Sequence, residues 1–316
     1  MVLRELKIGN ITVPVPIIQG GMAVRISTAR LAAAVANEGG VGIIAGTGMS
    51  LDELINEIRL ARKMTTGIIG VNVLFAVKEF SDLVKTAMKE GIDLFISGAG
   101  FSRDMFSWGK EYNTPIIPIV SSAKLAVMAE KLGAAAVIAE GKEAGGHLGT
   151  TRPMKDILPE ICKEVNIPVI AAGGIIDGKD IANAIKLGAS GVQMGTRFAA
   201  SEESNASKEM KALYLKASKE DVVLVSSPVG LPGQCIRNDF YNLVESGKSK
   251  SIDKCNACLK RCNHNFCIMK SLINACDSGN PEEALMFAGE LVYKIKKILP
   301  VKQIFNNLIN EVAEVK

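Results

Sequence analysis

The sequence predicts an α/β protein built on a closed TIM (β/α)8 barrel with a C-terminal helical extension, and three observations support this fold. Eight short apolar runs alternate with longer amphipathic segments in the first two-thirds of the chain. Glycine-containing segments follow most of these runs. No GxGxxG sequence follows the first run, which disfavours an open dinucleotide-binding sheet.

Each apolar run is typical of a parallel strand that is buried on both faces. The intervals between the runs are long enough for a loop and a helix each time, as a closed barrel of alternating strands and helices requires. The eight expected strands are Val15–Ile18, Val41–Ile44, Gly70–Leu74, Leu94–Ser97, Ile116–Val120, Ala136–Ala139, Pro168–Ala171 and Gly191–Met194.

Helical patterns occupy the intervals, with apolar residues three and four positions apart. Ser50 is expected to cap the helix that begins at Leu51, with Glu53 at the position that completes a capping box. The expected helices are Ala29–Glu38, Leu51–Met64, Ser122–Leu132 and Lys179–Leu187.

The character of the chain changes after Phe198, where polar and helical patterns replace the strand rhythm. Residues 1–200 are expected to form the barrel core with the cofactor site. Residues 201–316, called the extension below, are expected to form a mainly helical unit that packs on the barrel and contains a cysteine cluster within 255–267.

Composition and charge exclude several classes of protein. The chain has 316 residues, of which 48% are hydrophobic, and this is enough to bury a core and argues against disorder. The 37 basic and 33 acidic residues are nearly balanced, which argues against a nucleic-acid-binding protein. There is no uninterrupted apolar run long enough for a membrane span and no secretory signal, so a cytoplasmic location is expected.

The most informative segment for chemistry is IAEGKEAGGHLG, which follows the sixth expected strand and therefore lies on the active-site face of a barrel. It contains Glu140, Glu143 and His147 among four glycines. Histidine can donate or accept a proton near neutral pH, and glycines allow the backbone to approach a ligand closely. We therefore expect His147 to act in catalysis.

The segments after the seventh and eighth strands, PVIAAGGIIDG and GVQMGTRF, indicate a phosphate site. Barrels often bind phosphate with the backbone amides of these two loops. Gly173, Gly174, Gly195 and Thr196 supply the open backbone and a hydroxyl group. After the first strand, the backbone at IIQGGMA is expected to lie against a flat ring with Met22 as a polarizable contact, and Asn72 ends the third strand with an amide.

These motifs carry a resemblance to a known family. QGGM, GVN, EAGGH, PVIAAGGI and VQMGTRF occur in this order over roughly residues 13–233, and the chain resembles the flavin-dependent nitronate monooxygenases, once called 2-nitropropane dioxygenases. The same motifs mark the FMN-dependent enoyl-acyl-carrier-protein reductases of type II.

The resemblance implies a TIM barrel that binds FMN without a covalent link. It places the phosphate at Gly173-Gly174 and Gly195-Thr196, the isoalloxazine ring near Gly21, Met22 and Asn72, and the catalytic or substrate-orienting group at His147. The full set of cofactor-binding residues that it implies is Gly20, Gly21, Met22, Asn72, Glu140, Gly145, Gly146, Ala172, Gly173, Gly174, Gln193, Met194, Gly195 and Thr196.

The motifs leave the reaction open. The first expectation is oxidation of alkyl nitronates with O2, in which His147 holds the nitro oxygens or deprotonates a neutral nitroalkane. The alternative is reduction of an enoyl thioester with NAD(P)H, which would make an acyl carrier protein a partner. A flavin- or metal-binding regulatory protein is the non-enzymatic alternative, and a homodimer is left open.

The cysteine cluster is a departure from the family pattern. Its spacing is C-x2-C-x3-C-x4-C, which matches no standard signature closely. Four soft ligands in a cytoplasmic protein suggest zinc or an iron–sulfur cluster. The alternatives are packed or redox-active thiols without metal and, less in keeping with that compartment, disulfides. The candidate metal ligands are Cys255, Cys258, Cys262 and Cys267.

Overall fold

The computed structural model describes residues 1–249 and 255–315, and its centre is a closed barrel of eight parallel strands. This confirms the predicted TIM-barrel class, and every expected strand is present. In the order in which they pair around the barrel, the strands are β3 (Ile17–Gln19), β4 (Val41–Ala45), β5 (Ile68–Leu74), β6 (Leu94–Gly98), β7 (Ile116–Val120), β8 (Val137–Glu140), β10 (Val169–Ala172) and β11 (Gly191–Met194).

Helices surround the barrel, and the four expected from the sequence are all formed. Ser50 caps α2 as expected, because its side chain accepts a hydrogen bond from the amide of Glu53. The Glu53 carboxylate does not complete the capping box, since it forms a bidentate ion pair with Arg25 instead. The barrel helices up to residue 199 are α1 (Ala29–Asn37), α2 (Leu51–Met64), α3 (Phe80–Lys89), α4 (Asp104–Glu111), α5 (Ala123–Leu132), α6 (Met154–Glu164), α7 (Gly178–Lys186) and α8 (Thr196–Ala199).

Two apolar layers hold the barrel together. The interior is filled by isoleucines and other aliphatic side chains of the strands, and the hairpin of β1 (Leu6–Ile8) and β2 (Ile11–Val13) contributes to the same cluster. A second, larger layer lies between the strands and the surrounding helices. Because the barrel is closed, its strands leave no unpaired edge, and function is confined to the loops at its ends.

The extension differs from the expected mainly helical unit because it also contains two strands. β12 (Val222–Ser226) and β13 (Pro232–Ile236) pair with each other, and β13 also pairs with β9 (Gly146–His147) of the barrel loop, giving a three-stranded antiparallel sheet. The remaining elements of the extension are α9 (Lys208–Lys216), η1 (Lys219–Asp221), α10 (Asp239–Glu245), α11 (Ile268–Asp277), η2 (Val292–Lys294) and α12 (Val301–Glu314).

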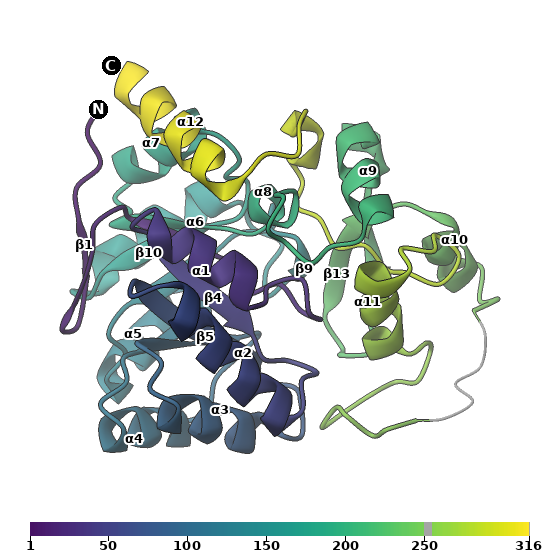
Figure 1. Ribbon diagram of the computed structural model, residues 1–316, viewed down its shortest axis with the longest axis horizontal. Coiled ribbons are helices and arrows are strands. Elements are labelled where there is room, and N and C mark those ends of the chain that lie inside the picture. The colour runs from purple at the N-terminus through teal and green to yellow at the C-terminus, as the bar shows by residue number, and fades with distance from the viewer. Residues whose placement is uncertain (250–254, 316) are drawn as a thin grey trace.

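The helix α12 belongs to the barrel and not to the rest of the extension. It packs against α7 and α1, beside the N-terminal segment (Figure 1). The ring of Phe305 is 1% exposed and lies 5.8 Å from that of Phe198, between their centroids. The expected boundary at residue 200 therefore separates α8 from a helix that completes the same ring.

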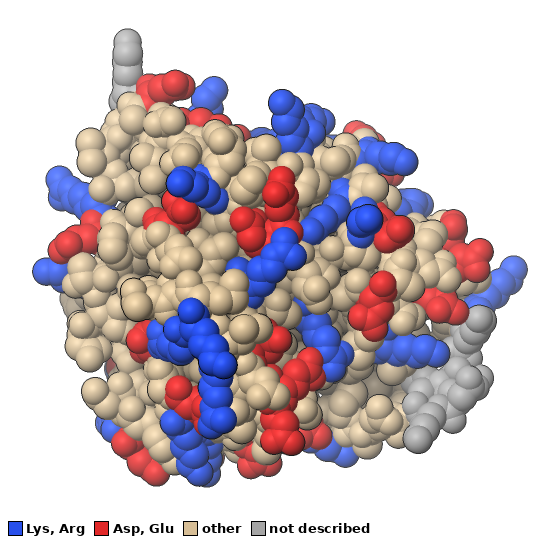
Figure 2. Space-filling view, in the orientation of Figure 1, with Lys and Arg blue, Asp and Glu red and all other residues tan. Residues whose placement is uncertain are grey.

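Charges of both signs are interspersed on the face shown in Figure 2, with no continuous basic stripe. Within the described ranges, no helix combines the length and apolar character that a membrane crossing needs.

The position of α12 gives a stability prediction. Phe305→Ala leaves a cavity between α12, Phe198 and Gly40, so we expect it to lower the free energy of unfolding by about 3–5 kcal/mol. Ile309→Ala on the same helix, where the side chain is 39% exposed, should cost less than about 1 kcal/mol. Urea unfolding followed by circular dichroism measures both, and equal effects of the two variants would contradict this role for α12.

Candidate active site

One pocket opens at the carboxyl ends of the barrel strands, and it is lined by residues that lie far apart in the sequence. Beside His147, it is lined by nearly all of the candidate cofactor-binding residues: Gly20, Gly21, Met22, Asn72, Glu140, Gly145, Gly146, Ala172, Gly173, Gly174, Gln193, Gly195 and Thr196. The structure thus brings together the loops after the first, third, sixth, seventh and eighth strands of the barrel.

Met194 is the exception, because its side chain lies on the other side of the strand. Successive residues of β11 point to opposite faces, so Gln193 faces the pocket whereas Met194, 1% exposed, is buried in the layer between strands and helices. We therefore exclude the Met194 side chain from the cofactor site.

Gln193 leaves a polar atom ready for a ligand. Its Oε1 is buried and has no hydrogen-bond partner within the described ranges. A buried acceptor without a partner is costly, and a ligand with an N–H or O–H group at this side of the pocket would satisfy it. A flavin carries both kinds of donor, on its ring and on its ribityl chain, so the residue fits FMN.

The side of the pocket near β3 and β5 is shaped by close approach of backbone and amide. A Cβ atom on Gly21 would lie 2.4 Å from Cβ of Asn72, so no side chain fits at this position. Asn72 is 8% exposed, and its Nδ2 donates to the carbonyl of Ile96 at 3.2 Å. This contact fixes the orientation of the amide at the pocket wall.

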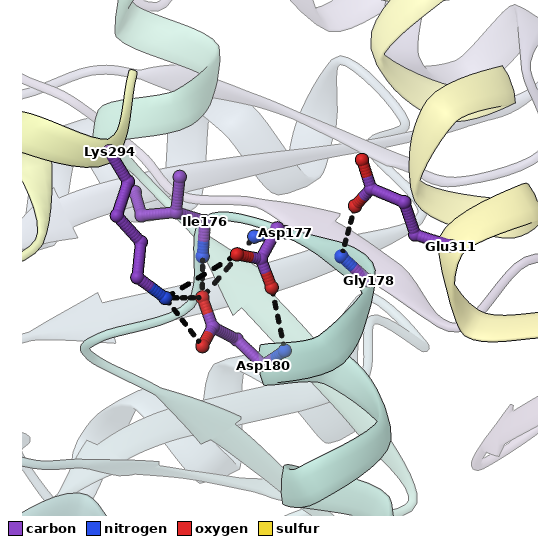
Figure 3. Close-up of polar contacts among 6 residues, drawn as sticks. All are labelled: Ile176, Asp177, Gly178, Asp180, Lys294 and Glu311. Atoms are coloured by element: carbon purple, nitrogen blue, oxygen red, sulfur yellow. Dashed lines mark hydrogen bonds and ion pairs between the residues drawn. The ribbon is translucent and has the colours of Figure 1, made fainter. Parts of the chain in front are cut away.

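The loop after β10 is held rigidly by the start of α7. Gly173 and Gly174 have φ values of 95° and 68°, which favour glycine. The loop then enters α7 through a capping box. The Asp177 carboxylate accepts from the backbone amide of Asp180, and the Asp180 carboxylate accepts from the backbone amide of Asp177. Figure 3 shows these contacts together with Lys294, whose ammonium group lies 3.0 Å from Asp180 Oδ1, and Glu311, which accepts from the amide of Gly178 at 2.7 Å.

The extension also reaches the loop after β11. The amide of Gly289 donates to Thr196 Oγ1 at 2.9 Å, and the amide of Glu290 donates to the carbonyl of Glu143 at 3.0 Å. Arg197 does not serve this loop, since its Nη2 donates to the carbonyls of Ala200 and Lys297. The open backbone around Gly173, Gly174 and Gly195 can therefore supply amides to an anion, while Arg197 holds the connection to α12.

The open backbone around Gly173, Gly174 and Gly195 is called the cradle below. His147 lines the same pocket as the cradle and lies on the short strand β9. β13 pairs with it in register, opposite Gly233, so the backbone of the extension fixes the position of the histidine. Its Nε2 is 2.7 Å from Ser227 Oγ, and its ring packs edge-to-face on Phe287 at 5.2 Å between centroids. Burial lowers the pKa of His147 to about 4, so the imidazole is neutral at pH 7.

Two carboxyl groups also line the pocket. Burial raises the pKa of Glu140 to about 7, so a large fraction of this group is protonated near neutral pH. Glu143 has a structural contact, because its Oε2 accepts from the amide of Met154 at 2.9 Å and so holds the loop that carries His147.

The extension supplies pocket residues that the sequence analysis missed. Tyr214 lines the pocket, and its hydroxyl donates to the carbonyl of Phe287 at 2.7 Å. Ser227 does not line the pocket but is buried in contact with His147. No local motif marks these residues, because they meet His147 only through the fold. The apolar wall that the extension adds to the pocket consists of Val229, Leu259, Ile268, Met269, Leu272, Phe287 and Leu291.

The part of the chain that the structure describes does not support the expected metal site at the cysteine cluster. Within the described ranges, no group of three or more His, Cys, Asp and Glu side chains is suitably arranged to hold a metal ion, and all four candidate cysteines are free thiols. The segment is instead attached to the barrel by backbone pairing: Lys78 N donates to Cys258 O, and Lys260 N donates to Ala76 O, each at 2.9 Å. The Lys260 ammonium group also lies 3.7 Å from the ring centroid of Phe75. These contacts secure Leu259 in the pocket wall without a metal.

The closed barrel, the glycine-lined cradle and the neutral histidine above it define a cofactor-dependent oxidoreductase of the TIM-barrel type. A family model described as "Nitronate monooxygenase" matches residues 4–311. The chain belongs to the nitronate monooxygenase family, whose members are FMN-dependent oxidoreductases, as the sequence motifs predicted.

Individual relatives show how far the similarity extends. The structure of FabK from Thermotoga maritima is 37% identical with a TM-score of 0.85, over 95% of this chain and 93% of that one. A nitroalkane oxidase from Streptomyces ansochromogenes is 25% identical with a TM-score of 0.82, over 95% and 96% of the two chains. A Mycobacterium tuberculosis protein, a 5-hydroxy-7a-methyl-1-oxo-octahydro-1H-indene-4-carboxyl-CoA dehydrogenase, is 35% identical over 235 residues, which are 73% of this chain and 66% of that protein.

Glu140 gives a pH prediction. Its pKa is about 7 in the folded chain against an ordinary value of 4.5, so burying its charge costs stability once it ionises. The cost is absent below pH 4.5, where the group is protonated in both states, and grows as the pH rises through 7. We therefore expect Glu140→Gln to raise the melting temperature of the flavin-free protein at pH 8 and to leave it unchanged at pH 4.

Thermal unfolding at several pH values measures this effect. Glu220→Gln, which changes an exposed carboxylate, is the control and should change the melting temperature at neither pH. A Glu140→Gln effect that is the same at pH 4 and pH 8 would show that the carboxyl group titrates normally.

Proposed function

We propose that this chain binds FMN in the pocket at the carboxyl ends of the barrel strands and oxidises alkyl nitronates with O2, with His147 positioning the substrate. The observation that carries the proposal is that a neutral histidine and the glycine-lined loops share one pocket. When bound, FMN supplies the redox chemistry, and the protein supplies position, polarity and hydrogen-bond donors.

The cradle is suited to a phosphate-bearing flavin. The amides around Gly173, Gly174 and Gly195 would bind the phosphate, because this is where barrels accept that group and these residues carry no side chain that would cover their amides. Gln193 Oε1 would accept a hydrogen bond from the flavin, and the backbone at Gly21 and Met22, which lines the pocket, would lie against its ring.

The lowered pKa of His147 favours one of the two roles considered for it. A base whose conjugate acid has a pKa of about 4 is poorly matched to removing a proton at neutral pH. A neutral imidazole still carries one N–H, which can donate to a nitro oxygen and hold the substrate carbon over the cofactor. His147 therefore acts as a hydrogen-bond donor to an already ionised nitronate.

A second candidate function is reduction of an enoyl thioester with NAD(P)H, and specific observations favour it. No lysine or arginine is among the described residues that line the pocket, so a neutral carbonyl is accommodated as readily as an anion. The apolar wall from the extension suits an acyl chain. FabK, an enoyl-acyl-carrier-protein reductase, is 37% identical, and the mycobacterial relative acts on a CoA thioester. In this reaction His147 would donate to the thioester carbonyl, and acyl carrier protein would be a partner.

One pair of assays separates the two reactions. Oxygen uptake with an alkyl nitronate in the absence of NAD(P)H supports the first function. Consumption of NAD(P)H with a crotonyl thioester of CoA or of acyl carrier protein supports the second. A protein that contains FMN and catalyses neither reaction would overturn both assignments.

The cradle gives a binding prediction. Gly174→Asp would place a negative charge beside the phosphate and a Cβ atom 3.1 Å from Glu143 Cβ, so we expect FMN affinity to fall by at least about tenfold. Gly247→Asp is the matched control, since Gly247 has the same φ of 68° and no atom within 4 Å of an added Cβ. Flavin content and fluorescence titration of the apoprotein measure both variants, and wild-type affinity in Gly174→Asp would exclude the phosphate from this loop.

His147→Ala tests the catalytic role. We expect the variant to fold and retain FMN while turnover falls by roughly 10²-fold, because the donor to the substrate is lost. His264→Ala, which removes the second histidine of the chain from an exposed position, should retain full turnover. Unchanged kcat and kcat/KM in His147→Ala would refute the assignment.

A further inference from the structure

Ser227 contacts the catalytic histidine from the extension. Its hydroxyl oxygen is 2.7 Å from Nε2 of His147, and its side chain is 1% exposed. The amide of Val229 donates to the same hydroxyl oxygen at 3.4 Å. Because this hydroxyl group is buried, water does not compete for its hydrogen bond with the ring nitrogen.

The backbone fixes this contact from both sides. Ser227 directly follows β12, and the partner strand β13 pairs Gly233 with His147. The amide of Gly230 donates to the carbonyl of Ser227 at 3.0 Å, which closes the turn between the two strands. Because His147 lies in this hydrogen-bonded sheet and Ser227 directly follows one of its strands, the backbone holds the two residues close together.

The direction of the hydrogen bond follows from the partners of the Ser227 hydroxyl group. Its oxygen accepts from the Val229 amide, and within the described residues Nε2 of His147 is the one acceptor within reach of its hydrogen. A buried O–H without an acceptor is costly, so the hydroxyl hydrogen is directed to Nε2. A neutral imidazole has one N–H and one acceptor nitrogen. If Nε2 accepts from Ser227, the proton of the ring is on Nδ1.

We propose that Ser227 is a positioning residue that fixes His147 in the Nδ1–H tautomer, so that Nδ1 is the donor offered to the substrate. This inference rests on the proposed role of His147 in the reaction. Phe287 restricts the ring from its side, and the Tyr214 hydroxyl holds the carbonyl of Phe287 in turn. The tautomer and the ring orientation are thus both set by the extension.

Nitrogen NMR of the FMN-loaded protein tests the tautomer directly. The chain has two histidines, so the ring signals of His147 and of the exposed His264 can be assigned with the two alanine variants described above. We expect the wild-type protein to show a protonated Nδ1 and an acceptor Nε2 in His147. Ser227→Ala should shift His147 toward the Nε2–H form, whereas Ser226→Ala, which removes the exposed neighbouring hydroxyl group, should not.

Steady-state kinetics give the functional readout. We expect Ser227→Ala to lower kcat about tenfold with KM changed less than about twofold, because the loss is that of one positioned hydrogen bond. Flavin content should remain unchanged, and Ser227→Thr, which keeps the hydroxyl group, should restore the wild-type tautomer. A wild-type spectrum with Nε2–H, or an identical spectrum in Ser227→Ala, would overturn the proposal.

The role of His147 in the reaction and the positioning role of Ser227 can be disproved independently. If His147→Ala is fully active while Ser227→Ala shifts the tautomer, the assigned reaction role is wrong and the Ser227 contact stands. If His147→Ala is inactive and the Ser227→Ala spectrum is unchanged, only the positioning role is wrong.

Discussion

The pairing of β9 with β13 is the constraint on which the active site depends. Only two residues of the barrel loop take part, but their register with Gly233 and Gln234 joins the barrel to the extension. The Gln234 side chain strengthens the junction by donating to the carbonyl of Ala144 at 2.7 Å. As a result the extension, and not the barrel alone, determines where the imidazole of His147 lies and what surrounds it.

The cofactor cradle has a different physical basis. Glycine-lined loops expose backbone amides, but such loops are useful only if they are held in place. Here the capping box at α7, the Lys294 ion pair and the Glu311 contact hold the loop after β10 from behind. Lys294 and Glu311 both lie after residue 290, so the C-terminal part of the chain stabilises a site that the middle of the chain builds.

The barrel and the cradle were predictable from the sequence because their signals are local. Continuous apolar runs identify buried strands, and glycines directly after them identify the ligand face. Met194 shows the limit of this reasoning, since the motif places it beside Gln193 but the strand alternation turns its side chain outward. Gln193, Met194, Gly195 and Thr196 were all assigned to the site, and Met194 is the one of the four that does not line the pocket.

The surroundings of His147 were not predictable because the residues that form them are far apart in the sequence. Ser227 lies 80 residues away along the chain, and no spacing rule connects the two. The strand β13 was missed because it contains a proline and a glycine, which weaken a strand signal. The run of β12, VVLVS, is rich in β-branched residues and does carry a strand signal. The cysteine cluster misled in another way: its spacing suggested metal ligands, whereas backbone pairing with the loop after β5 already secures the segment.

The place of α12 in the helix ring has a consequence for synthesis on the ribosome. α8 ends at Ala199 and α12 begins at Val301, so about a hundred residues separate consecutive members of the ring. At typical translation rates this interval takes roughly 5 to 20 s, during which all eight strands have been made but the apolar groove between α1 and α7 has no helix to cover it. The nascent chain therefore exposes an apolar surface that is open to aggregation until α12 has been synthesised.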